Sequence, residues 1–500
     1  MTEFAAGPRI EREPALEVTD ADSLERALAQ RHRTPEQVEQ FGVEAVPSER
    51  KTTGAWDLFG IQLSFQINNL TITMPALAVL AGLNVWAALL SQVIGVGLVF
   101  LGYIALATIG SKYGIPGQVG ARIAFGVFGS KVTASLMRSI ASAYWFAWQT
   151  LAAALGIQVI LKAWTGNDYD LIVISVLFAV FQTAIALTGW ESLRYLTRVV
   201  LPIKLVFLSV VIIAFVTSSR PEFGWTHVTS GGSWAWSGIA LWAGTIAAGH
   251  LSMYTDSADL ARYAKSSRSM AAAFYGAALV SVVFCGIIGI WAAKGVGDGN
   301  WFAGAADVQP HVWMYLLLII VLVADNWFIN IMNLYTGGFA VVNVIGRIGR
   351  FWSTVLIAIA GITLSGFKGV YDNTPTFVNE IGFAFAPVGG ILLAHYVLLS
   401  RGRIDLPSIY TPLRGAYRYL GGVNPVAVVV GVLGYLLARS DLIGTALIRP
   451  LAVVVITGAA YAVAMAVVAR VWAPARDSIA HEAMKDHYDP VEIDRDLVAA

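Results

Sequence analysis

Long apolar runs separated by short polar segments fill most of this chain. Each run is close to the length of about 20 residues that a helix needs to cross the hydrocarbon core of a bilayer. The pattern predicts an all-α polytopic membrane protein with twelve transmembrane helices, over residues 56–81, 84–110, 137–163, 170–189, 199–217, 234–256, 269–294, 311–340, 351–367, 377–400, 423–439 and 445–469.

The composition supports this class and excludes several others. Of the 500 residues, 57% are hydrophobic and 13% are charged, whereas a soluble domain carries about 25% charged residues. The net charge of +1 gives no reason to expect a nucleic-acid partner. Cys285 is the one cysteine, and no Cys–His cluster has metal-site spacing, so we expect neither a disulfide within the chain nor a metal or other cofactor.

The basic residues predict which side of the membrane each loop faces. With a cytosolic N-terminus, the internal segments hold most lysines and arginines, Arg138 and Arg262 among them. The external segments then hold only Lys162, Arg220, Lys294, Lys368, Arg439 and Arg449. This bias predicts a multi-pass protein of the plasma membrane with both termini in the cytosol. The first 54 residues lack the apolar core of a signal peptide, and residues 34–42 have the pattern of a short helix.

Adjacent amides interrupt the first apolar run. Gln66, Asn68 and Asn69 lie at expected bilayer depth, where an unsatisfied polar group costs on the order of several kcal/mol. Pro75 follows, removes a backbone donor and frees a carbonyl near Thr71. The cluster predicts a helix that unwinds locally, with its amides facing a protein cavity. An ordinary patch of interhelical hydrogen bonds, worth about 0.6 kcal/mol each, is the alternative.

The third run carries an aromatic and an amide on one helix face. Trp145 and Gln149 are four residues apart, so their side chains are neighbours on a helix. An indole can stack on a planar heterocycle while the amide supplies a donor and an acceptor. The alternative is a belt of aromatic residues at the membrane interface, to which Trp148 could belong.

The sixth run contains a histidine and ends in charges. His250 could be a structural hydrogen-bonding group, a substrate contact or a proton carrier. Asp259 and Arg262 are three residues apart, and this spacing favours a salt bridge at the helix end over a direct role in chemistry.

The eighth run has a polar stripe next to a carboxylate. Asn326, Asn330 and Asn333 recur at helical spacing. Asp325 is a carboxylate inside an apolar helix, where such groups can exchange protons. Glu380, near the start of the tenth run, is either a second such group or a residue at headgroup level.

Together these motifs resemble the nucleobase:cation symporter-1 family, which contains the purine–cytosine permeases and the hydantoin and allantoin transporters. The resemblance extends from about Trp56 to about Ala469. It rests on five segments in this order, at residues 112–116, 121–129, 145–150, 259–263 and 386–390.

The resemblance implies a LeuT-like fold, in which spans 1–5 and 6–10 form a 5+5 inverted repeat and two extra helices follow. Spans 1 and 6 would be broken near the midplane. The expected organisation is a cytosolic tail over 1–54, a first repeat over 55–218, an inverted repeat over 219–402, spans 11 and 12 over 403–470 and a second cytosolic tail over 471–500.

The resemblance also implies site residues. Trp145 and Gln149 match the aromatic and the amide that hold a planar substrate, and Asn69 matches an asparagine of span 1. The purine–cytosine branch carries a Trp-Gln pair where this chain has Gly249 and His250, so His250 or the upstream Trp242 would substitute. The expected substrate site comprises Trp145, Gln149, Asn69, Gln66, His250, Trp242, Asn330 and Asn333, with Gln149, His250 and Asn330 facing the amide cluster across a central cavity.

The residues of span 8 favour protons over sodium as the coupling ion. Hydroxyl residues that ligate sodium in the hydantoin transporter align with Phe328 and Ile329, whose side chains offer no oxygen to a hard cation. The expected proton-coupling groups are Asp325, Glu380 and His250.

The function expected is secondary active import of a nucleobase or related planar nitrogen heterocycle, of the cytosine, purine, uracil or allantoin class, by proton-coupled alternating access. A sodium-coupled symporter of a hydantoin-, vitamin- or nucleoside-like substrate and a passive facilitator remain alternatives. No nucleotide-binding loop, zinc-protease motif or cysteine cluster is present, so we do not expect an enzyme. The expected partners are the heterocycle and the lipid bilayer.

Overall fold

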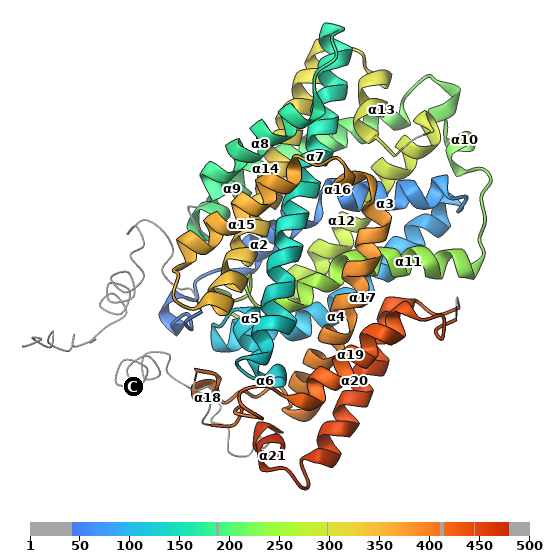
Figure 1. Ribbon diagram of the computed structural model, residues 1–500. Coiled ribbons are helices and arrows are strands. Elements are labelled where there is room, and N and C mark those ends of the chain that lie inside the picture. The colour runs from blue at the N-terminus through green and yellow to red at the C-terminus, as the bar shows by residue number, and fades with distance from the viewer. Residues whose placement is uncertain (1–42, 187–189, 298, 411–414, 445, 480–500) are drawn as a thin grey trace, which may run out of the picture.

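The computed structural model of the protein describes residues 43–479, apart from residues 187–189, 298, 411–414 and 445. Most of these residues are helical, and no β-strand occurs among them (Figure 1). The short helix predicted near residue 34, and most of both predicted tails, lie outside the described residues. The α-helices of five or more residues are α2 (Ala55–Gln66), α3 (Asn69–Leu80), α4 (Val85–Tyr113), α7 (Met137–Thr165), α8 (Leu171–Ala186), α9 (Trp190–Val216), α10 (Trp225–Thr229), α11 (Trp236–Leu251), α12 (Ser267–Val296), α13 (Trp301–Val308), α14 (Val312–Ile345), α15 (Arg350–Ser365), α17 (Thr374–Leu393), α18 (Leu406–Tyr410), α19 (Pro425–Arg439), α20 (Arg449–Val468) and α21 (Ala473–Ile479).

Short helical turns connect these helices. Single turns α5 (Gly117–Gly120), α6 (Arg122–Phe125) and α16 (Gly369–Asp372) lie in the loops. A π-helical turn, η2 (Lys131–Leu136), leads into α7, and another, η5 (Ala394–Leu399), continues α17. The 3₁₀ turns are η1 (Ser48–Arg50), η3 (Pro221–Phe223) and η4 (Ser252–Thr255).

Each predicted span coincides with a helix or with two consecutive helical segments. Among the described residues, seven helices are long and apolar enough to cross a membrane, and α2 with α3 forms one further, bent pair. The shorter helices α8, α11, α15 and α19 occupy the remaining predicted spans. The all-α membrane fold is confirmed, while the count of twelve crossings stays a prediction.

The first span is broken at Ile67 and Asn68. Helix α2 ends at Gln66, α3 begins at Asn69, and the two axes differ by 49°. Asn68 is extended and caps α3, because its side-chain oxygen accepts a hydrogen bond from the Thr71 amide at 3.1 Å. The local unwinding predicted from the amide cluster is therefore confirmed.

A proline in α3 also has the predicted effect on the backbone. Pro75 cannot donate to the carbonyl oxygen of Thr71, four residues earlier. Gln92 of α4 donates to that oxygen through its side-chain amide at 2.8 Å. A neighbouring helix thus replaces the missing hydrogen bond, as a backbone polar group inside a membrane requires.

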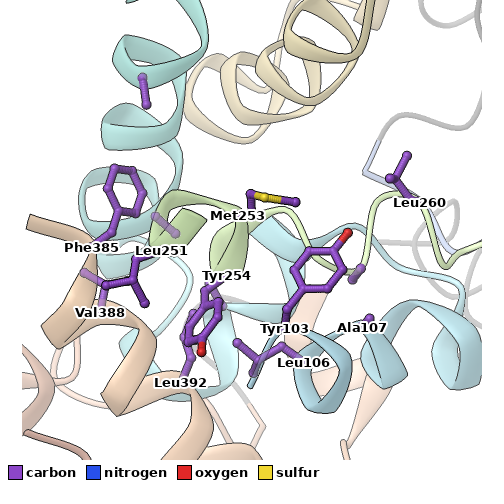
Figure 2. Packing of buried hydrophobic residues seen from close by; sticks show 14 of the residues in the cluster. Tyr103, Leu106, Ala107, Leu251, Met253, Tyr254, Leu260, Phe385, Val388 and Leu392 are labelled. Carbon is purple, nitrogen blue, oxygen red and sulfur yellow. The ribbon is translucent and has the colours of Figure 1, made fainter. Parts of the chain in front are cut away.

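The sixth predicted span also loses its α-helical form, near its end. Helix α11 ends at Leu251, continues as η4 through Thr255, and then runs in turns to Tyr263. Figure 2 shows η4 packed between α4 and α17, with Tyr254 lying between the two helices. Its hydroxyl donates to the Val99 carbonyl at 2.9 Å, which fixes η4 against α4.

The two broken spans lie among long continuous helices. Helix α7 packs along α14 and α15, while α12 packs against α2, α3 and α4. Helix α11 packs against α4 and α17. Helices α19 and α20 lie against α17 at one side of the bundle (Figure 1). The breaks are therefore buried within the bundle.

Close contact between α3 and α12 depends on a glycine and gives a first prediction. A Cβ atom at Gly289 would overlap the carbonyl oxygen of Ile72, which cannot move without distorting α3. We expect Gly289→Ala to destabilise the fold by about 1–3 kcal/mol, as overpacking does. The midpoint of thermal unfolding in detergent measures the loss.

Gly276→Ala is the matched control on the same helix. A Cβ atom there would lie 3.6 Å from the Phe59 ring, an ordinary contact. This variant should keep the wild-type midpoint or exceed it slightly, since alanine favours helix. Equal midpoints for the two variants would contradict the close contact.

Candidate functional site

A cavity lies where the break in the first span faces α7, η4 and α14. About 450 Å³ of space free of protein atoms, part of it open to solvent, lies between its walls. Its walls come from both broken spans and from two continuous helices. The lining residues are Phe65, Gln66, Asn68, Leu70, Thr71, Arg138, Trp145, Gln149, Gly249, His250, Ser252, Met253, Ile329 and Asn333.

Gln149 presents an unused acceptor to this cavity. Its side-chain oxygen is buried and has no hydrogen-bond partner among the described residues. Its backbone carbonyl, by contrast, accepts from Asn326 at 2.5 Å. A buried acceptor left unsatisfied costs about 1–3 kcal/mol, so a ligand that donates to Gln149 would recover that free energy.

The Trp145 ring lies beside Gln149 and is held by its neighbours. Tyr144 and Trp148 contact it nearly edge-on, with interplanar angles of 75° and 79°. Trp148 is itself buried, donates to Thr374 at 2.6 Å and stacks on Tyr371. The alternative in which Trp148 belongs to an interfacial belt is therefore not met, because its indole joins α7 to α16 and α17 inside the protein.

His250 and Gln66 connect the two broken spans across the cavity wall. Nδ1 of His250 lies 2.8 Å from the Ile246 carbonyl oxygen. That oxygen can only accept, so Nδ1 carries a proton. Nε2 lies 3.2 Å from the side-chain oxygen Oε1 of Gln66. His250 thus belongs to α11 but contacts the end of α2, as well as the cavity.

Arg138 lines the cavity next to η4. Its guanidinium forms an ion pair with Asp256 at 2.7 Å and donates to Thr336 at 2.9 Å. Both charged side chains are almost fully buried. The sequence places Arg138 among the cytosolic charges and does not predict it in the cavity, whereas the structure shows it as the second residue of α7, buried against Ser252 of η4. Arg138 is therefore a cavity residue that the sequence analysis did not predict. A charged residue at the start of an apolar span was the signal that could have indicated it.

Two of the three asparagines in the predicted stripe of α14, Asn326 and Asn330, point away from the cavity. Asn330 donates to Gln182 at 2.7 Å and to Thr150 at 3.0 Å, so it faces α7 and α8. Only Asn333 reaches the lining, and it also donates to Asn330 at 3.2 Å. The expectation that Asn330 faces the cavity is wrong, because Asn326 and Asn330 share a helix face that packs on α7.

Asn69 and Trp242 also lie outside the lining. The side-chain oxygen of Asn69 accepts from the Trp301 indole at 3.4 Å, which ties α3 to α13. Trp242 precedes His250 by two helical turns, about 12 Å along the axis, and packs in a separate apolar cluster. The structure thus brings together Gln66, Trp145, Gln149, His250 and Asn333 of the expected substrate site.

The two carboxylates expected to couple protons are in ion pairs outside the lining. Asp325 pairs with Lys204 of α9, in the interior. Glu380 pairs with Arg439 at 2.6 Å, and both side chains are partly exposed. The exposure of Glu380 favours the headgroup-level alternative for this residue.

The charges after η4 hold the loops on the expected cytosolic side. Asp259 accepts a hydrogen bond from the Gly117 amide at 2.8 Å. Arg262 donates to the carbonyl oxygens of Gly114 at 3.0 Å and Glu44 at 2.7 Å. Burial, and to a smaller extent the charge of Asp256, raises the pKa of the Asp259 carboxyl. These contacts join three segments below the cavity, and neither residue lines it.

A neighbouring lysine reinforces the same junction. Lys51 donates to the carbonyl oxygens of Lys112 at 2.8 Å and Ser111 at 3.2 Å. Burial, with a smaller contribution from the Arg262 charge, lowers the pKa of Lys51 to about 8. Among the described residues, no three His, Cys, Asp or Glu side chains are grouped to hold a metal ion.

Comparisons with known proteins identify relatives of this chain. A family model described as permease for cytosine/purines, uracil, thiamine and allantoin matches residues 45–473. The hydantoin permease of Microbacterium maritypicum is 24% identical over 76% of this chain and 80% of its own length. The cytosine permease of Escherichia coli K12 is 27% identical over 69% of this chain and 80% of its own length.

Solved structures share the fold. Mhp1, a nucleobase-cation-symport-1 family transporter in a closed conformation with bromovinylhydantoin bound, gives a TM-score of 0.72 at 21% identity, over 87% of this chain and 98% of that one. A Na⁺-coupled sialic acid symporter gives a TM-score of 0.58 at 14% identity, over 83% of this chain and 91% of that one. The expected LeuT-like arrangement is thereby confirmed.

The buried pair of Arg138 and Asp256 gives a second prediction. Arg138→Met would leave the Asp256 carboxylate buried without its partner, so we expect a loss of about 3–5 kcal/mol in the free energy of unfolding. Arg220→Met is the control, because its pair with Asp307 is exposed and should contribute about 0–1 kcal/mol. Thermal unfolding of both variants in detergent provides the comparison, and a loss for Arg138→Met no larger than the control's would contradict the buried pair.

Proposed function

The chain belongs to the family of permeases for cytosine and purines, uracil, thiamine and allantoin, and from this premise we propose that it imports a planar nitrogen heterocycle through the cavity described above. It is a membrane permease and not an enzyme. The proposed substrate class is that of nucleobases, hydantoins and allantoin. The proposed location is the plasma membrane, with both termini in the cytosol.

One observation carries the choice of substrate class: the buried, unpartnered oxygen of Gln149 beside the Trp145 ring. Nucleobases and hydantoins are flat, so an indole face can hold them, and their ring N–H groups can donate to an amide oxygen. Gln66, His250 and Asn333 add polar groups around the same space. A purely apolar ligand would leave the Gln149 oxygen unsatisfied.

The two broken spans support transport by alternating access. The cavity wall combines α2, α3 and α11 with the continuous helices α7 and α14. The first set has breaks at Ile67–Asn68 and at Ser252, where short segments can reorient without breaking a regular helix. In the proposed cycle, α2, α3, α4, α11 and α12 rock against the other helices and open the cavity to each side in turn.

Proton coupling is the proposed driving force, with His250 as the proton carrier. Among His250, Asp325 and Glu380, only His250 lines the cavity, and its contact with Gln66 links it to the helix break. Binding of substrate and a change in protonation can therefore affect the same wall. Sodium coupling and passive facilitation are the competing outcomes.

Uptake with a Gln149 variant tests the substrate site. Cells expressing the chain should take up at least one of labelled cytosine, adenine, hypoxanthine, uracil, allantoin and hydantoin. Gln149→Ala should raise the KM for that compound about 10-fold or more, since losing a hydrogen bond to a buried group costs about 1–3 kcal/mol. Gln158→Ala on the same helix should leave the KM unchanged, because that amide binds only the Tyr169 carbonyl at the exposed end of α7.

Two results would contradict this site. Absence of uptake for all six compounds, with the protein present in the membrane, would exclude the substrate class. Unchanged uptake by Gln149→Ala would exclude its oxygen as a substrate contact while leaving the permease assignment intact.

Ion replacement tests the coupling. With choline in place of sodium, uptake should persist, and a protonophore should abolish accumulation above the external concentration. Loss of uptake without sodium would favour the sodium symporter. Uptake that never exceeds the external concentration, even before the protonophore is added, would favour the facilitator.

A further inference from the structure

Lys204 is a fully buried cation in the middle of α9, and no role in binding the substrate involves it. Its ammonium donates to the carbonyl oxygens of Ser64 at 2.6 Å and Ile67 at 2.7 Å. It also forms an ion pair with Asp325 of α14. An ammonium has three donors, and here three oxygens surround it.

The position of two of these oxygens explains why a cation is needed. Ser64 lies in the last turn of α2, and Ile67 is the C-cap residue that directly follows the helix. The last carbonyls of a helix have no partner within the helix, and they carry the negative end of its dipole. Inside a membrane no water is available to satisfy them. The break in the first span therefore creates a negative site at Ile67.

The same three oxygens are a donor set suited to a hard metal cation. Backbone carbonyls together with a carboxylate are typical ligands of such ions. Asp325 supplies the negative charge, and the next turn of α14 presents Phe328, whose ring centre lies 5.9 Å from Nζ of Lys204. The site is thus arranged for one positive charge, and a side chain from α9 provides it.

We propose that Lys204 is a built-in cation, whose ammonium takes the place that a bound metal ion would otherwise fill at the break in the first span. It holds the end of α2 to α9 and α14, so this junction forms without sodium or potassium. The site of Lys204 is separate from the cavity, and the proposal rests on the proposed function only in treating the junction as part of a transport cycle.

A thermal-unfolding experiment on the purified full-length chain tests this directly. Wild-type protein should have the same unfolding midpoint in sodium, potassium, methylammonium and choline chloride at equal ionic strength. Lys204→Ala removes the ammonium and leaves the three oxygens facing a space. We expect its midpoint to fall, and sodium or methylammonium to recover most of the loss in a concentration-dependent manner, since a ligand that binds only the folded state stabilises it. Choline, which is too large, should not.

Two further variants serve as controls. Lys204→Met keeps a side chain of similar length without charge, so it should be destabilised and show no recovery with any cation. Lys162→Ala should match wild type in every salt, because its pair with Asp168 is exposed.

The outcomes separate the possibilities. A wild-type midpoint that rises with sodium but not with choline would overturn the proposal, as would a folded Lys204→Ala variant that no small cation stabilises. If Lys204→Ala folds only when methylammonium or sodium is present during purification, the proposal is supported; failure in every salt overturns it. None of these readouts uses a heterocycle, so failure of the proposed substrate class would leave them unchanged.

Discussion

The break at Ile67 and Asn68 is the constraint on which the rest of the structure depends. A helix that stops inside a bilayer leaves carbonyl and amide groups without partners, and each such group costs on the order of several kcal/mol unless the protein supplies one. Asn68 caps the second half, Lys204 binds the end of the first half, and Gln92 binds the carbonyl that Pro75 releases. These contacts fix the positions of α3, α4 and α9 around the break.

The two sides of the break have different partners. One side faces α9 and α14, where the charges of Lys204 and Asp325 balance each other away from the cavity. The other side faces α7 and α11, where Gln66, Gln149 and His250 surround an open space. Cation and heterocycle would thus act on the same few residues of the first span from opposite directions. A shift of the backbone at Ile67 and Asn68 would therefore alter both the contacts of Lys204 and the wall of the cavity.

The sequence predicts the helices and the break well, because both follow from strong local signals. Apolar length predicts the spans, and amides followed by Pro75 predict the unwound segment. The inward direction of Trp145 and Gln149 follows from helical spacing and the family resemblance. The rotation of a helix about its axis is harder to predict from the sequence. The asparagine stripe of α14 can be recognised in the sequence, but in the structure Asn330 faces α7 and α8, and Asn333 lines the cavity. Partners far apart in sequence, such as Lys204 with Ile67 or Arg138 with Asp256, depend on the tertiary fold.

An experimental structure of the chain with a transported heterocycle bound is the most direct test of the central claim. The compound from the uptake panel with the lowest KM would be used. We expect its ring to lie against the Trp145 indole, with a ring N–H donating to the Gln149 side-chain oxygen, in the cavity bounded by Gln66 and His250. Density for the compound elsewhere in the protein, with this cavity empty, would contradict the account.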